Sequence, residues 1–183
     1  MLGFSQNGRR QAAAGGPTDS GWLTAGAVTD NVDEGNSWSS LSNALVDNTA
    51  VASCMNIGVH ESTNSLNCTN FGAVVPSGAT INGVEFRQKT RANNSNDMVR
   101  DATFILKAGT KSGTGDGVYF GGLTNTRRLD DVVDLLDVHG TTLTPSDVNN
   151  TGFGMWLRWE DDGAGSGDDT YLAVAQLKIH YTT

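Results

Sequence analysis

The sequence predicts an all-β protein: an antiparallel β-sandwich, jelly-roll-like, with one or two short helical turns and an extended N-terminal arm. Three observations support this class. The chain has 23 glycines and many Asn, Ser and Thr residues, whereas the strong helix formers Lys and Glu are scarce. Several segments alternate apolar and polar residues with a period of two, which is typical of a strand with one buried face. Clusters of Gly, Asn, Asp and Ser separate these segments, and the length of 183 residues suits one domain.

Residues 1–20 are expected to form a flexible arm, and residues 21–183 a single sandwich domain. Up to residue 18 the arm has two positive charges and no acid, whereas the rest of the chain has 10 basic and 20 acidic residues. A basic arm therefore precedes an acidic body. The arm is either a frayed terminus or a tether that becomes ordered on a partner. The residues expected to contact such a partner are two apolar and two basic side chains: Leu2, Phe4, Arg9 and Arg10.

Strands are expected wherever the alternation is clear. In chain order these segments are 22–28, 50–57, 71–75, 84–87, 102–107, 118–121, 153–160 and 171–181. The last segment alternates most strictly, and its predicted buried face consists of Tyr171, Ala173, Ala175, Leu177, Ile179 and Tyr181. Because an acidic, glycine-rich loop joins the last two segments, they are predicted to form an antiparallel pair within the sandwich.

Two short helical turns are expected. Thr144 offers a capping hydroxyl, Pro145 suits the first helical position, and Asp147 places an acid in the first turn. A second turn is expected over residues 38–45, with Ser37 as its cap.

The charge of the chain excludes several classes of function. A net charge of −8 and a pI near 4.6 argue against binding to nucleic acid or to an anionic membrane surface. No apolar run approaches a membrane span, and the N-terminus lacks the pattern of a signal peptide. The three histidines, His60, His139 and His180, are scattered, and no GxSxG motif is present. We therefore expect neither an enzyme nor a cofactor.

The acidic segment between the last two strands is a weak candidate for a calcium site. Its carboxylates flank glycines, and Ca²⁺ prefers oxygen ligands. Their spacing matches no EF-hand or nonapeptide repeat, so a solvated hairpin loop without metal is the favoured interpretation. The carboxylates concerned are Asp161, Asp162, Asp168 and Asp169.

Cys54 and Cys68 flank a predicted strand–turn–strand unit, so a disulfide between them is geometrically feasible. Free buried thiols are the favoured interpretation.

Trp156 and Arg158 form a candidate contact surface. If Phe153 and Trp159 point into the core, the alternation turns Trp156 outward beside Arg158. An outward Trp is suited to contact with another subunit or a ligand. The alternative is that Trp156 is buried under the N-terminal segment.

Several short motifs resemble a β-sandwich domain that recurs in virion structural proteins of tailed bacteriophages. They are Leu66, Phe71-Gly72, the run from Pro76 to Glu85, the run from Pro145 to Asn149, Phe153-Gly154 and the run from Ile179 to Thr182. Pro76 and Gly78 turn the chain, and Ile81, Val84 and Phe86 are expected in the core. The resemblance covers most of residues 36–183. It implies a non-enzymatic part of the particle, such as a head decoration, a head fibre or a tail tip.

Within that resemblance, a capsid decoration (cement) protein is the favoured expectation. Its arm would dock on other virion proteins, above all the major capsid protein, and the protein would be a homo-oligomer, with a trimer favoured. The protein would be located in the virion, which is assembled in the host cytoplasm. The alternative is a tail-fibre or tail-tip module that recognises a host surface glycan. A carbohydrate-active enzyme is less favoured, because it needs two carboxylates about 5–10 Å apart across a cleft.

Overall fold

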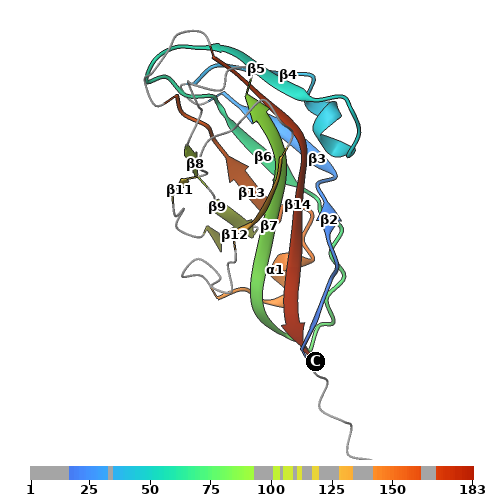
Figure 1. Cartoon of the computed structure of the whole chain (residues 1–183). Helices are drawn as coiled ribbons and strands as arrows, with labels where there is room; N and C mark the ends of the chain where they lie inside the picture. Colours follow the sequence, from blue (N-terminus) through green and yellow to red (C-terminus); the bar gives the residue numbers. More distant parts are fainter. Residues whose placement is uncertain are drawn as a thin grey trace, which may run out of the picture.

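The computed structural model describes residues 17–32, 35–92, 101–103, 105–108, 111–112, 117–119, 128–133, 142–161 and 168–183. These residues form two antiparallel sheets and a two-stranded ribbon, and the core lies between the two sheets (Figure 1). The predicted all-β, sandwich-like class is confirmed.

The larger sheet is built around β14, whose two edges are both paired. β7 runs along one edge over almost its whole length, from Ala92 opposite Thr170 to Thr80 opposite Thr182. Along the other edge, β5, β2 and β1 pair with β14 one after another. The strands of this seven-stranded sheet are β1 (Pro17–Asp19), β2 (Leu23–Thr24), β4 (Trp38–Ser39), β5 (Ala52–Ile57), β7 (Thr80–Ala92), β12 (Arg128–Val133) and β14 (Asp168–Thr182).

The second sheet has five strands in the order β10-β9-β13-β6-β3. Their bounds are β3 (Ala27–Asn31), β6 (Ser65–Thr69), β9 (Ile105–Ala108), β10 (Lys111–Ser112) and β13 (Gly154–Leu157). The separate ribbon consists of β8 (Asp101–Thr103) and β11 (Gly117–Tyr119).

The predicted pairing of segment 153–160 with segment 171–181 is wrong. β13 pairs with β6 and β9, whereas β14 belongs to the other sheet. The chain leaves the five-stranded sheet just after β13, where Glu160 bridges to Ser62 and the Asp161 N–H donates to the Glu61 carbonyl. β7 and β5 already pair with the two opposite edges of β14, so β13 has no edge of that strand to join.

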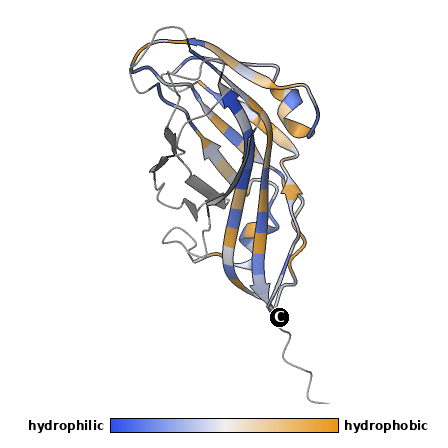
Figure 2. Ribbon diagram, viewed as in Figure 1, coloured by the Kyte–Doolittle hydropathy of each residue, from blue (hydrophilic) through white to orange (hydrophobic). Residues whose placement is uncertain are grey.

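Large apolar side chains from both sheets meet in the core. Trp38 of the larger sheet packs against Trp159, with ring centroids 5.1 Å apart. Figure 2 shows hydrophobic and hydrophilic residues alternating along β7 and β14, as expected for strands with one face on this core. The largest fully buried side chains are Trp159, Phe86, Phe153, Ile57, Leu66, Met155, Leu157, Leu172, Leu177 and Ile179.

The predicted buried face of the last strand is wrong at Tyr171, because β14 contains a β-bulge. The register of β14 against β7 shifts between Leu172 and Val174, so the inward positions change parity there. Leu172 is buried before the shift, and Leu177 and Ile179 are buried after it. Tyr171 therefore lies on the outer face, where its ring contacts Arg91.

The strand predicted over residues 71–75 is absent, although its side chains still alternate between core and solvent. Phe71 and Val75 are buried, whereas Val74 is 85% exposed. The Asn149 side chain replaces a neighbouring strand: it accepts from the Val75 N–H and donates to the Val75 carbonyl, both at 2.8 Å. One amide thus satisfies both backbone groups of an extended residue outside the sheets.

The segment predicted as one strand over residues 22–28 is divided between the two sheets. β2 pairs with β14 in the larger sheet, and β3 pairs with β6 in the smaller one. The chain crosses at Gly26, where a Cβ atom would lie 2.6 Å from the Asn70 carbonyl oxygen. Only glycine allows this close approach of the two backbones.

The helical turn at Thr144 is confirmed as α1 (Pro145–Val148), with a complete capping box between Thr144 and Asp147. The second turn is shorter than predicted. It is a 3₁₀ helix, η1 (Leu41–Leu45), whose cap position is Ser40, because Trp38 already belongs to β4. In the described part of the chain, no helix has the length and apolarity needed to cross a bilayer.

The first strand begins earlier than predicted. Pro17 opens β1 opposite Thr182, and Ser20 is bonded twice to Ile179, through its own N–H and through its hydroxyl. Proline is tolerated at this position because the first residue of an edge strand needs no donor. Residues 17–20 therefore belong to the sheet, and the arm residues Leu2, Phe4, Arg9 and Arg10 lie outside the described residues.

Candidate binding surface

The predicted contact pair, Trp156 on β13 and Arg158 just after it, lies where the alternation placed it. Phe153 and Trp159 are buried, and Trp156 and Arg158 are half-buried on the outer face. Trp156 Nε1 donates to Asn67 Oδ1 at 2.9 Å, and the Arg158 guanidinium donates to the Ser62 hydroxyl. Both side chains are thus held by residues of the β5–β6 connection and β6. The predicted contact of this pair with a subunit or ligand stays a prediction.

A polar hollow of about 400 Å³ lies next to Arg158. Its polar groups bond to one another: Glu61 accepts from the Asn36 side chain and from the Gly58 N–H, both at 3.1 Å. These two hydrogen bonds, the one from Asn36 first, lower the pKa of Glu61 below its usual value. Glu61 is therefore already engaged by neighbouring protein groups, and we assign no ligand to the hollow. Its lining consists of Gly35, Asn36, His60, Glu61, Ser62 and Arg158.

The acidic segment is less solvated than predicted at its two ends. Asp161 is fully buried and Asp168 is 2% exposed, because both ends are tied to the β5–β6 region. Asp169 accepts from the Asn56 N–H and from the Tyr171 hydroxyl. Asp162 lies outside the described residues. Within the described ranges, no three His, Cys, Asp or Glu side chains are placed to hold a metal ion.

The two cysteines are free and buried, in agreement with the thiol prediction. Cys54 lies on β5 and Cys68 on β6, so they belong to different sheets. Burial is the main cause that raises the pKa of each thiol to about 12. Both groups are therefore protonated and unreactive in the folded protein near neutral pH.

A different surface carries most of the basic side chains that the structure describes, and the sequence analysis did not identify it. It lies on the outer face of β7 and β14, with one contribution from the residue before β2. We call it the cation–aromatic face. It consists of Trp22, Glu85, Arg87, Lys89, Arg91, Tyr171, Gln176, Lys178 and His180.

Trp22 is fixed on this face by two cations from neighbouring strands. The Arg87 guanidinium carbon is 4.1 Å and the Lys178 Nζ 4.7 Å from the centre of an indole ring. Arg87 Nε also donates to Gln176 Oε1 at 2.7 Å, and Gln176 Nε2 donates to Thr24 Oγ1 at 2.8 Å. The indole is thus held at a defined place by cation–π contacts and by a hydrogen-bonded support beneath them.

Glu85 lies beside this indole and accepts from two donors on β14. Its carboxylate is 2.7 Å from Lys178 Nζ and 2.8 Å from His180 Nε2. Burial alone would raise the pKa of Glu85, but the hydrogen bonds from Lys178 and His180 outweigh it and lower the pKa. The carboxylate therefore stays ionised at neutral pH.

A second ring–guanidinium pair lies further along the same strands. Arg91 lies over the Tyr171 ring at 4.4 Å, and the Tyr171 hydroxyl donates to Asp169 at 3.1 Å. Burial first, and then the Asp169 charge, raise the pKa of Tyr171. Between the two pairs, Lys89 forms an ion pair of 2.7 Å with Asp47.

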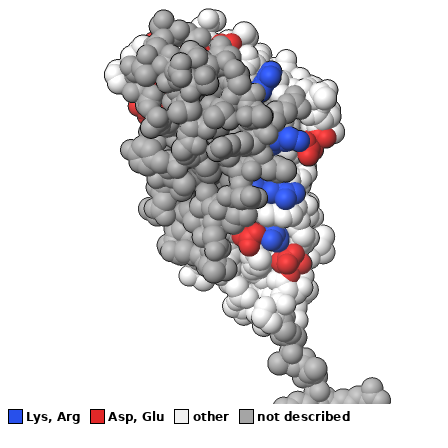
Figure 3. All heavy atoms as spheres, viewed as in Figure 1, with Lys and Arg blue, Asp and Glu red and all other residues white. Residues whose placement is uncertain are grey.

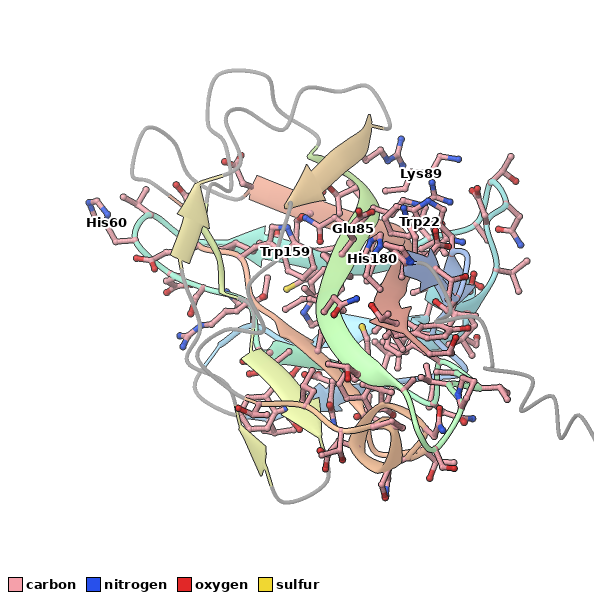
Figure 4. The ribbon with its side chains drawn as sticks, turned by 90° about the horizontal axis from the view of Figure 1, so that it is seen from below. Trp22, His60, Glu85, Lys89, Trp159 and His180 are labelled. Carbon is pink, nitrogen blue, oxygen red and sulfur yellow. The ribbon has the colours of Figure 1, made fainter. Side chains whose placement is uncertain are left out.

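The basic residues are concentrated on this face. Of the five Lys and Arg residues whose side chains the structure describes, four lie here and only Arg158 lies elsewhere. Figure 3 shows them as a row over β7 and β14, and Figure 4 places Trp22, Glu85, Lys89 and His180 together, away from His60. The sequence carries one sign of this row, since Arg87, Lys89 and Arg91 occupy alternate positions of one strand. The approach of Trp22 depends on the pairing of β2 with β14, which no local pattern shows.

Comparison of the chain with protein-family models, with curated proteins and with solved structures finds no match.

Proposed function

We propose that this chain is a non-enzymatic structural protein of a tailed-phage virion, and that it decorates the capsid by docking its N-terminal arm on other virion proteins. The observation that carries the proposal is the seating of β1. β1 and the following Ser20 bind lengthwise to the end of β14, so residues 1–16 join the body at the end of its central strand. A partner bound to the arm is thereby connected directly to the core of the fold.

The motifs on which the resemblance depends have structural roles in this chain, which supports a shared scaffold. Asn149, the last residue of one motif, bonds to both backbone groups of Val75, which immediately precedes the motif from Pro76 to Glu85. Gly154 lies so close to β6 that a Cβ atom would be 1.8 Å from the Cys68 carbonyl oxygen. Such residues maintain a sandwich and carry no particular reaction, as expected for a structural domain.

The arm alone is a weak anchor, so we propose that several copies act together. Ordering each arm residue costs about 1–2 kcal/mol of backbone entropy. Leu2, Phe4, Arg9 and Arg10 do not offset that cost for a segment of 16 residues. A symmetric homo-oligomer, with a trimer favoured, presents several arms at once and raises the apparent affinity without new contacts.

The test is re-binding to phage particles that lack this protein, with the major capsid protein as the expected partner. The full chain is compared with a variant that lacks residues 1–16 and with a full-length variant carrying Leu2→Ser, Phe4→Ser, Arg9→Gln and Arg10→Gln. Both variants should keep the body folded and lose most of their occupancy. Full occupancy of either variant would show that docking does not depend on the arm.

Copy number separates this proposal from the tail-tip alternative. A decoration protein should be present in hundreds of copies per particle, whereas a tail-tip protein should be present in only a handful. Quantitative mass spectrometry of purified particles measures this number directly.

A further inference from the structure

We infer that the cation–aromatic face binds an acidic, uronic-acid-bearing polysaccharide. This inference does not rest on the proposed arm docking, because the face lies on the outer side of β7 and β14 and the arm joins at the end of β14. It gives the body of the protein a ligand of its own.

The first argument is charge complementarity. Lys89 and Lys178 are already paired with Asp47 and Glu85. Among the described side chains, Arg87 contacts the neutral Gln176 and Trp22, and Arg91 contacts the Tyr171 ring. Among the described residues, neither guanidinium has a carboxylate partner. Guanidinium groups recognise planar carboxylates in two-pronged geometry, so these two positions are suited to the carboxylates of an acidic sugar chain.

The second argument is that each spare guanidinium lies next to an aromatic ring. A sugar offers an apolar C–H surface for a ring and hydroxyls for polar neighbours, and Trp22 and Tyr171 supply large amphipathic rings. Glu85 and Gln176 supply acceptors beside Trp22, and Asp169 supplies one beside Tyr171. The two ring–guanidinium pairs are separated by four residues of a strand, about 13 Å, so one linked sugar chain can reach both.

The composition of the face favours this ligand over a protein or a nucleic acid. The centre of a protein interface is depleted in charge, yet five of the nine residues of this face are Lys, Arg or Glu, and none of the described large hydrophobic residues that are strongly exposed lies on β7 or β14. Nucleic acid carries a phosphate about every 3.4 Å of each strand and needs a continuous excess of positive charge, whereas Asp47 and Glu85 pair with the two lysines here and leave two separate guanidinium positions, Arg87 and Arg91.

The test is isothermal titration calorimetry of the full chain with oligogalacturonate, a polymer of uronic acid. Dextran of matched length serves as the neutral probe, and single-stranded oligothymidylate serves as the phosphate polyanion. We expect binding to oligogalacturonate only, and weaker binding at higher salt because charge pairs contribute. The inference would be overturned if dextran bound as tightly as oligogalacturonate, if oligothymidylate bound more tightly, or if no probe bound.

Matched variants place the ligand on the face. Arg87→Gln and Trp22→Leu should each weaken binding about tenfold or more, because each removes one half of a ring–guanidinium pair. Arg158→Gln removes the same charge from the other sheet and should change the affinity less than twofold. Equal losses for Arg87→Gln and Arg158→Gln would show an effect of net charge and contradict the assignment.

Conservative variants distinguish a loss of affinity caused by misfolding from one caused by loss of the recognised groups. Trp22→Phe keeps a ring and Arg87→Lys keeps a charge, so both should retain more affinity than Trp22→Leu and Arg87→Gln. Affinities are compared only between variants whose melting temperatures match that of the unaltered protein. If the conservative variants lose as much affinity as the others while remaining folded, the recognition does not use the ring and the charge, and the inference fails.

Discussion

Leu177 is a core residue whose contribution to the stability of the sandwich can be tested with a single substitution. It is fully buried on β14, opposite Phe86 of β7. Leu177→Asp should lower the free energy of unfolding by several kcal/mol, because it buries a carboxylate without a partner. Thermal unfolding followed by circular dichroism measures the change.

The control for Leu177→Asp is Val74→Asp, which adds the same carboxylate at an apolar position that is 85% exposed. Val74→Asp should leave the melting temperature almost unchanged. If Leu177→Asp were as stable as this control, the assignment of the inner face of β14 would be wrong.

Glu85 provides a residue-scale prediction that depends on pH. Its pKa in the folded protein is lowered from 4.5, so the folded state holds this proton less tightly than the unfolded state does. The stability that the carboxylate contributes is therefore present above about pH 4.5 and is lost as the pH falls further. Glu85→Gln should cost about 1 kcal/mol or less at pH 7, and the difference from the unaltered protein should shrink as the pH falls below about 4.5.

Urea unfolding at several pH values from 7 to 3 measures this difference. Glu160→Gln removes an exposed carboxylate near the polar hollow and serves as the control. A difference between Glu85→Gln and the unaltered protein that stays constant down to pH 3 would contradict the ionic role of Glu85.

At this scale the sequence predicts side-chain direction well wherever the strand is regular. The outward position of Trp156 and the inward positions of Phe153 and Trp159 follow from alternation alone. Tyr171 could not be placed in this way, because a single bulge reverses the parity of β14 and no residue type marks it.

At the scale of elements, the Asn149 side chain makes the hydrogen bonds that a neighbouring strand would otherwise make to Val75. Two hydrogen bonds of 2.8 Å join it to Val75, and each contributes about 1 kcal/mol when its groups are shielded from water. Asn149→Ala should therefore lower the free energy of unfolding by about 2 kcal/mol or more, because it also leaves the backbone groups of Val75 without these partners.

Asn82→Ala is the matched control, since Asn82 makes an exposed bond to Thr182 where β7 pairs with the end of β14. Chemical denaturation of both variants should separate them by more than about 1 kcal/mol. An Asn149→Ala variant as stable as Asn82→Ala would mean that the segment 71–75 is held by its buried side chains alone.

The elements that sequence patterns missed are those set by distant partners. Local spacing predicts α1, because its cap, proline and acid are adjacent. It does not predict that β13 and β14 separate into two sheets, because that outcome depends on β7 and β5 occupying the edges of β14. The cation–aromatic face is hidden for the same reason, since it requires Trp22 and Arg87 to meet across three strands.

At the scale of the whole molecule, the boundary between arm and body can be located by truncation. Removing residues 1–16 should leave the melting temperature unchanged, because β1 is kept. Removing residues 1–20 should lower it, because the pairing of β1 with β14 and both bonds of Ser20 to Ile179 are lost. Differential scanning calorimetry of the two truncated chains compares them directly, and equal melting temperatures would place the boundary after β1.

The seating of β1 and β2 on β14 also determines how the body responds to a mechanical load. Residues 17–19 pair with residues 180–182, and Leu23 and Thr24 pair with Leu177 and Gln176 further along the same strand. A pull on the N-terminal segment along the axis of β14 therefore loads all these hydrogen bonds together in shear. A pull across the sheet would break them one at a time. The direction of the force, more than the number of bonds, should decide how long the N-terminal strands stay paired with β14 under load.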